Sequence, residues 1–376
     1  MKRVYLDNAA TTPLDEDVQQ AMIKVMNEDF GNPSSVHAHG RKAKTLVEDS
    51  RKQVAQCLNA SIGEIYFTSG ATESNNTAIL CAVRDLGVKR IITSPTEHPC
   101  VINSIAAVKN HFSIDVEQLS VDNRGNVNMN ELANALKSSD EKTLVSLMLG
   151  NNEVGTMLDF ETCSQICHDN EALFHTDSVQ AIGKKDIDLS TTYVSFLSAT
   201  GHKIFGPKGT GILYVNSNNI ISPFINGGGQ ERNLRSGTEN TYGIVGFATA
   251  FEKMHFNRKA YDAKLTSLRN HMKAGLMKEV PEATFNGNQD ELTLSHILSV
   301  SVPQSEKAEM IIFNLDINGI SASAGSACSS GAVQSSHVLA ALGVTADRKT
   351  IRFSFSPHNT FEELDYAIEQ FKKALA

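Results

Sequence analysis

The stretch "YVSFLSATGHKIFGPKGTGILYV", residues 193–215, holds two apolar runs separated by a turn rich in glycine. The runs 193–199 and 211–215 have the residue types typical of β-strands. Five similar runs precede them, at residues 64–69, 90–94, 113–120, 143–149 and 172–177. Longer helical patterns lie between the runs, at residues 73–87, 99–111 and 160–170. Strand–helix alternation of this kind predicts an α/β domain around a mainly parallel, seven-stranded sheet.

The pattern changes after about residue 240. Long helical patterns lie at 243–279, 305–316, 332–342 and 360–374, and short strands lie at 296–302, 319–323 and 350–355. This mixture predicts a smaller α+β domain. A chain of 376 residues is also too long for one average domain. We therefore expect a large domain at residues 16–255 and a small domain built from residues 1–15 and 256–376.

The composition excludes several classes of protein. With 41% hydrophobic and 20% charged residues, it is typical of a globular protein. The net charge of −8 argues against nucleic acid as the main partner, because phosphate binding needs a basic face. No apolar run approaches the roughly 20 residues of a membrane span, and the N-terminus lacks the apolar stretch of a signal peptide. We expect a cytoplasmic protein with no direct membrane contact.

Six cysteines in a chain of this size do not make a disulfide framework. Cys57 and Cys81 lie inside helical apolar patterns, as small buried hydrophobes do. Cys163 and Cys167 are spaced to share one face of a helix, but a zinc site needs further ligands that the sequence does not offer at matching spacing. The prediction is reduced thiols and no metal site.

The segment "FTSGATESNN", residues 67–76, places a strand end before a helix start. Gly70 turns the chain and Thr72 opens the helix. Free backbone N–H groups at a helix start, with hydroxyls beside them, form an anion site. Simple capping of the helix explains the same residues equally well, and the P-loop motif is absent.

Two further polar clusters follow strands. In "SATGHKIFGPKGTG", residues 198–211, Lys203 lies between polar residues and a rigid Gly-Pro turn, as a Schiff-base lysine would, although an isolated lysine is usually a surface residue. In "FHTDSVQAIG", residues 174–183, Asp177 follows a strand and Gln180 comes three residues later. A lysine and an aspartate that pairs with a pyridinium nitrogen are the groups that pyridoxal 5'-phosphate (PLP) chemistry needs. The phosphate would then bind at the helix start near Thr72.

A series of motifs extends over essentially the whole chain. They are "YLDNAATTP" (5–13), "GNPSSVHAHGR" (31–41), "TSGATESNN" (68–76), "TEHPCV" (96–101), "NNEVGT" (151–156), "HTDSVQ" (175–180), "GHKIFGPKGTG" (201–211), "NLRSGTEN" (233–240), "GSACSSG" (325–331) and "TIRFSFSPHNT" (350–360). In this order they resemble the cysteine desulfurases of the iron–sulfur-cluster assembly type, in the class V aminotransferase branch. The resemblance implies the aspartate-aminotransferase-like fold of PLP enzymes, called fold type I.

The resemblance also implies a role for each matching residue. Lys203 binds the cofactor aldehyde, and Cys328 takes the substrate sulfur. Asp177, Gln180, His98 and Asn152 contact the cofactor ring. The phosphate is held by Gly70, Ala71, Thr72, Thr200 and His202, and Thr238 reaches the phosphate in the neighbouring subunit of a homodimer. Arg352 and Asn152 bind the substrate carboxylate, and His98 is a candidate proton shuttle. Gly150 and Gly201 differ from the residues that are commoner at these positions in the family. Neither difference alters a side chain with an implied chemical role.

Simpler interpretations remain for two of these residues. His98 precedes Pro99 and would cap a helix without any chemical role, since polar residues commonly satisfy helix ends. Arg352 would be a surface residue at a strand start.

The implied activity converts L-cysteine to L-alanine and transfers the sulfur to Cys328 as a persulfide. An iron–sulfur scaffold or another sulfur-acceptor protein then receives it. The alternatives are a selenocysteine lyase or aminotransferase of the same fold, and a cofactor-free scaffold protein. Cys328 lies in "SASAGSACSSGAVQSS", residues 321–336, which is nearly all Ser, Ala and Gly. Such a run predicts a mobile loop with weak order around residues 325–334 and with Cys328 away from Lys203 at rest.

Overall fold

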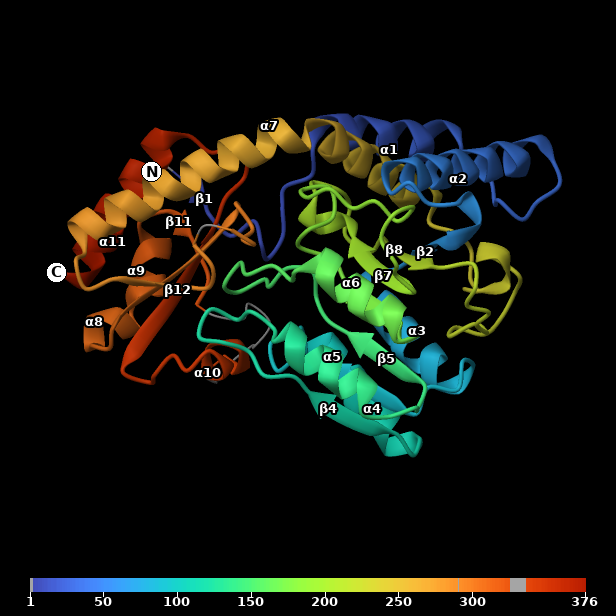
Figure 1. Cartoon of the computed structure of the whole chain (residues 1–376). Coiled ribbons are helices and arrows are strands. Elements are labelled where there is room, and N and C mark those ends of the chain that lie inside the picture. The colour runs from blue at the N-terminus through green and yellow to red at the C-terminus, as the bar shows by residue number, and fades with distance from the viewer. Residues whose placement is uncertain (1–2, 290, 325–335) are drawn as a thin grey trace.

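The computed structural model describes residues 3–289, 291–324 and 336–376. Two lobes lie side by side and are joined along one long helix, α7 (Thr241–Glu279), which runs over both of them (Figure 1). The first half of α7 packs on α1 and α2, and its second half packs on α11. The described part of the chain contains no helix long and apolar enough to cross a membrane.

The larger lobe is built on a seven-stranded sheet. Its strands are β2 (Ile65–Thr68), β3 (Arg90–Thr93), β4 (Asp115–Gln118), β5 (Thr143–Ser146), β6 (Leu173–Asp177), β7 (Phe196–Thr200) and β8 (Gly211–Val215). Their order is β2-β8-β7-β6-β5-β3-β4, and only β8 runs antiparallel to its neighbours. All seven strands overlap the predicted runs, although β4, β5 and β7 differ from them by two or three residues at one or both ends. The prediction of a mainly parallel α/β sheet is confirmed.

Both faces of this sheet are covered by helices. These are α1 (Glu16–Glu28), α2 (Ala38–Cys57), α3 (Ala71–Arg84), α4 (Pro99–His111), α5 (Met129–Lys137) and α6 (Phe160–Asp169). Successive side chains of a strand point to opposite faces, so Leu173 joins the apolar core under α3 and α4 whereas Phe174 joins the core under α2, α6 and α7. Cys163 and Cys167 are both buried on the inner face of α6, as their spacing predicts.

The smaller lobe has its own apolar core and two short sheets. β9 (Thr284–Asn286), β10 (Ile297–Pro303) and β12 (Arg348–Ser354) are antiparallel, and β1 (Val4–Tyr5) pairs with β11 (Ile320–Ser321). The helices are α8 (Glu306–Glu309), α9 (Ile311–Ile317), α10 (His337–Ala341) and α11 (Phe361–Leu375). The single helix expected at 305–316 is therefore two, because Met310 (φ −87°, ψ 1°) leaves helical geometry between them.

The N-terminal strand β1 lies in the smaller lobe, while α7 passes without a break through residues 255 and 256. Leu6 packs in the core of the smaller lobe together with Leu265 and Phe353. Leu294 and Ile297, by contrast, belong to the core of the sheet lobe. The division into residues 16–255 and the remainder stays a prediction.

Candidate active site

A cavity of about 240 Å³ opens where the two lobes meet, at the carboxyl ends of β6 and β7. In a parallel sheet this edge is where ligands commonly bind. The cavity wall brings together six of the predicted site residues, which are His98, Asn152, Asp177, Gln180, Lys203 and Arg352. They lie up to 254 positions apart in the sequence, so the tertiary structure alone makes them neighbours.

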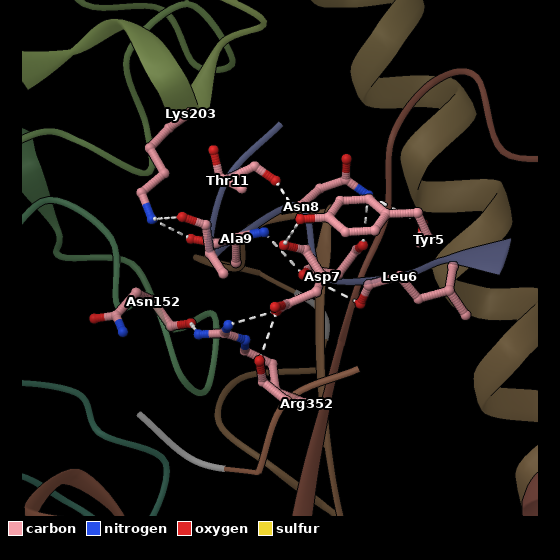
Figure 2. Close-up of polar contacts among 12 residues, drawn as sticks. Tyr5, Leu6, Asp7, Asn8, Ala9, Thr11, Asn152, Lys203 and Arg352 are labelled. Carbon is pink, nitrogen blue, oxygen red and sulfur yellow. Dashed lines mark hydrogen bonds and ion pairs between the residues drawn. The ribbon is translucent and has the colours of Figure 1, made fainter. Parts of the chain in front are cut away.

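Lys203 projects into the cavity from the turn that follows β7. Its ammonium group donates to the backbone oxygens of Ala9 and Ala10, each at 2.6 Å (Figure 2). The N-terminal segment therefore forms the wall opposite the lysine. Lys203 is only partly buried, and its amine lies at the cavity surface rather than on the outside of the protein.

Asp177 is the last residue of β6 and is buried in the cavity wall. One carboxylate oxygen accepts from the side-chain amide of Asn75 at 2.7 Å, and the other accepts from the backbone N–H of Val179 at 3.0 Å. Nε2 of His175 lies 3.1 Å from the amide oxygen of Asn75. The two hydrogen bonds to Asn75 and Val179 fix the position of the carboxylate.

His98 both caps α4 and lines the cavity. The backbone N–H of Cys100 donates to Nδ1 of His98 at 3.2 Å. Because Nδ1 accepts this bond, the ring proton of the neutral imidazole is on Nε2. Burial lowers the pKa of His98, and the nearby Lys203 acts in the same direction while Asp177 opposes it. The capping interpretation is thus correct, but it does not exclude a chemical role.

Arg352 lies within β12 and is only 2% exposed. The interpretation as a surface residue is wrong, because the strand is covered on both sides. Its guanidinium donates to Asp7 Oδ1 and to the backbone oxygen of Asn152, both at 2.8 Å (Figure 2). Nε of Arg352 is buried without a hydrogen-bond partner among the described residues. A guanidinium with unused donors at a cavity wall suits a carboxylate ligand.

The predicted phosphate residues meet where α3 begins beside the end of β7. Gly70 has φ +148°, which favours glycine, and a Cβ there would lie 3.5 Å from Thr200 Oγ1. No side chain of the described residues caps α3, so Ala71 and Thr72 present backbone N–H groups at an open helix start. His202 contacts Thr11 Oγ1 at 3.2 Å through Nδ1. Burial, aided by Lys203, lowers the pKa of His202 to about 4, so it is neutral near pH 7.

The wall of this cavity does not include the predicted phosphate residues Gly70, Ala71, Thr72, Thr200 and His202, nor does it include Thr238. Thr238 lines a second hollow of about 170 Å³ together with Ser69 and Arg235. Its predicted contact is with the neighbouring subunit and stays a prediction. Cys328, and with it the expected mobility and position of its loop, lies outside the described residues.

The residues present fit PLP. Lys203 supplies an amine, Asp177 supplies a carboxylate for the ring nitrogen, and the uncapped start of α3 suits the phosphate. Lys203 and Asp177 line one cavity at the end of a mainly parallel sheet with helices on both faces, and α3 begins beside Thr200 at the end of β7. The fold and the site define a fold type I PLP enzyme.

The chain belongs to the aminotransferase class-V family, whose model matches residues 4–367. It is 40% identical to a cysteine desulfurase IscS from Methanosarcina thermophila, over 98% of this chain and 91% of that protein. It is 38% identical to the cysteine desulfurase NifS of Azotobacter vinelandii, over 100% of this chain and 93% of that protein. The X-ray structure of a NifS-like protein from Rickettsia africae has a TM-score of 0.90 at 32% identity, covering 100% of this chain and 99% of that one.

Three residues of the site had no predicted role. Asp7 and Asn75 lie inside the motifs at 5–13 and 68–76, so their position in a motif was a usable signal. His296 contacts Gln180 at 3.0 Å, but it lies in no motif and no local pattern marks it. Only the folded structure identifies this last contact.

Proposed function

We propose that this protein is a PLP-dependent cysteine desulfurase, which releases L-alanine from L-cysteine and transfers the sulfur to Cys328. One observation carries most of the weight. The amine of Lys203, the carboxylate of Asp177 and the guanidinium of Arg352 lie on the wall of the same cavity. An amino-acid substrate needs both a carboxylate site and a base beside its Cα.

Each of these cavity residues has a separate role in the reaction. Bound PLP withdraws electrons from the substrate Cα and makes its proton acidic. Arg352 holds the substrate carboxylate, aided by Asn152, and the amine of Lys203 takes the proton from Cα and returns one later. Asp177 balances the positive charge of the ring nitrogen. His98 is neutral and carries its proton on Nε2, so it can pass a proton at the substrate sulfur.

Cys328 completes the reaction as its thiolate. It attacks the substrate sulfur, so that the carbon–sulfur bond breaks and a sulfur–sulfur bond forms. The carbon that loses sulfur gains a proton. One cysteine and one enzyme thiol thus become one alanine and one enzyme persulfide, and the atoms balance. A thiol reductant, or an acceptor protein, then removes the outer sulfur.

The direct test is to incubate the purified protein with L-cysteine and a thiol reductant and to follow alanine and sulfide together. We expect equal amounts of the two, and an additional sulfur on Cys328 by mass spectrometry when the reductant is omitted. Cys328→Ser should bind PLP as the wild type does but release no sulfur from cysteine. A keto acid in place of alanine would instead indicate an aminotransferase, and turnover of selenocysteine alone would indicate a selenocysteine lyase.

The remaining expectations concern partners and location. A homodimer, in which Thr238 of one subunit reaches the site of the other, is supported by the family resemblance around residues 233–240. The acceptor would be an iron–sulfur scaffold or a thiolation protein. The five described cysteines are all unpaired, which suits a reducing compartment such as the cytoplasm. Light scattering of the purified protein tests the dimer, and an apparent mass near one chain would contradict it.

A further inference from the structure

His296 connects the smaller lobe to the cofactor cavity. It lies just before β10 and is 2% exposed. Its Nε2 is 3.0 Å from the side-chain oxygen Oε1 of Gln180, which lines the cavity from the sheet lobe. This contact joins residues 116 positions apart and involves neither Lys203 nor Arg352 directly.

The surrounding hydrogen bonds determine which way the amide of Gln180 points. Nε2 of Gln180 is 3.0 Å from the backbone oxygen of Ala9, which can only accept. The amide must therefore direct its NH₂ group toward Ala9 and its oxygen toward His296. That oxygen also only accepts, so His296 must donate from Nε2. The network allows one orientation of the amide and one tautomer of the ring.

The environment of His296 keeps it in this neutral form. Nδ1 is buried and has no hydrogen-bond partner in the part of the chain that the structure describes. Burial lowers the pKa of His296 well below its ordinary value. Four nearby cationic side chains lower it further, namely Lys184, Lys185, Arg352 and Lys203. A second ring proton would create a buried cation among these positive charges.

We propose that His296 is a positioning residue that fixes the amide of Gln180, so that Gln180 presents an N–H group and not its oxygen to the ring oxygen of bound PLP. The inference rests on the PLP site described above. Gln180 uses one of its two amide hydrogens on Ala9, and the second is the donor left for a ligand. An N–H donor stabilises the ionised form of the ring oxygen and thereby favours the unprotonated lysine–cofactor linkage near neutral pH.

The test compares His296→Leu, which removes the donor, with His296→Gln, whose amide nitrogen can replace Nε2. Ser301→Ala is the matched control, because it removes a buried hydrogen-bonding side chain from β10 away from the cavity. Each protein is titrated with PLP, and the absorbance of the bound cofactor is followed against pH. For His296→Leu we expect roughly tenfold weaker PLP binding and a midpoint about one pH unit higher. His296→Gln and Ser301→Ala should match the wild type.

An unchanged PLP affinity and midpoint in His296→Leu would overturn the proposal, as would the same shift in Ser301→Ala. If His296→Leu does not fold, His296→Asn replaces it, since its shorter amide does not reach Gln180, and the same shift is expected. The wild-type titration separates this inference from the proposed function. A wild-type protein that gains no cofactor absorbance disproves the PLP site itself, whereas a normal wild type with an unaffected variant disproves only the role of His296.

Discussion

The two sides of the cavity are built in different ways. On the sheet side, Asp177 ends β6, Lys203 follows the neighbouring parallel strand β7, and His98 begins a helix. On the opposite side, Arg352 lies within an antiparallel strand and Asp7 lies in an extended segment near the N-terminus. The sheet side positions its groups by local turns and helix starts. The opposite side depends on an ion pair between residues 345 positions apart.

This difference has an energetic consequence. Groups at strand ends are positioned by the backbone. A side-chain substitution there removes the functional group but leaves the neighbouring residues in place. Arg352 and Asp7 hold each other, with side chains 2% and 19% exposed, so substituting one changes the environment of the other. Substitutions on the sheet side should therefore act on turnover, and those on the opposite side should act on substrate binding and should be coupled.

The largest effect is expected for Lys203→Ala on the sheet side. Removing the amine that moves the Cα proton should lower kcat for alanine formation by ~10⁴-fold. The measurement is alanine production at saturating L-cysteine. Lys208→Ala is the control, because Lys208 lies in the same motif but is exposed, and it should retain activity close to wild type. A Lys203→Ala enzyme with near-normal turnover would remove the lysine from the mechanism.

On the opposite side, Arg352→Lys should lower kcat/KM for L-cysteine by about 10²-fold, mainly through KM. The substitution keeps the charge but loses the planar fork that binds a carboxylate and Asp7 together. Arg348→Lys makes the same change in the same strand, where the side chain bonds backbone oxygens away from the cavity. A loss of kcat with unchanged KM would show that Arg352 does not bind the substrate carboxylate.

Asp7→Asn should have a smaller effect, about a tenfold loss in kcat/KM. The neutral amide keeps the shape of the side chain but weakens a charge-assisted hydrogen bond to Arg352. In the double variant with Arg352→Lys the two losses should not add, because both act on one ion pair. A gain in kcat/KM would instead mean that Asp7 competes with the substrate for Arg352.

The smallest effect concerns acid stability on the sheet side. Burial lowers the pKa of His175 to about 3, whereas its unfolded value is near 6.5. Below about pH 6.5 the unfolded chain binds a proton that the folded one does not, so the unfolding free energy falls by ~1.4 kcal/mol per pH unit from this residue. Below about pH 6, the unfolding free energy from urea titrations should fall less steeply with decreasing pH in His175→Gln than in the wild type, by about this amount. Equal slopes in both proteins would contradict the lowered pKa of His175 in the folded protein.

The sheet side of the molecule was largely predictable from the sequence. Alternating apolar runs located all seven strands, and the polar residues after them include Asp177 and Lys203. Arg352 was identified only through the family resemblance, because a mid-strand arginine has no local signature. The contacts of Asp7 and His296 were not predicted at all. Their partners lie 345 and 116 residues away, beyond the reach of any local pattern.

The sequence by itself determined the fold class, the family and most of the chemical groups, because strand periodicity and motif order are local properties of the chain. Only the tertiary structure decided how those groups are oriented. It brings Asp7 to Arg352 and His296 to Gln180, and thereby selects one guanidinium geometry and one amide orientation. The physical reason is that buried donors and acceptors must find partners, and those partners are chosen by packing across the two lobes.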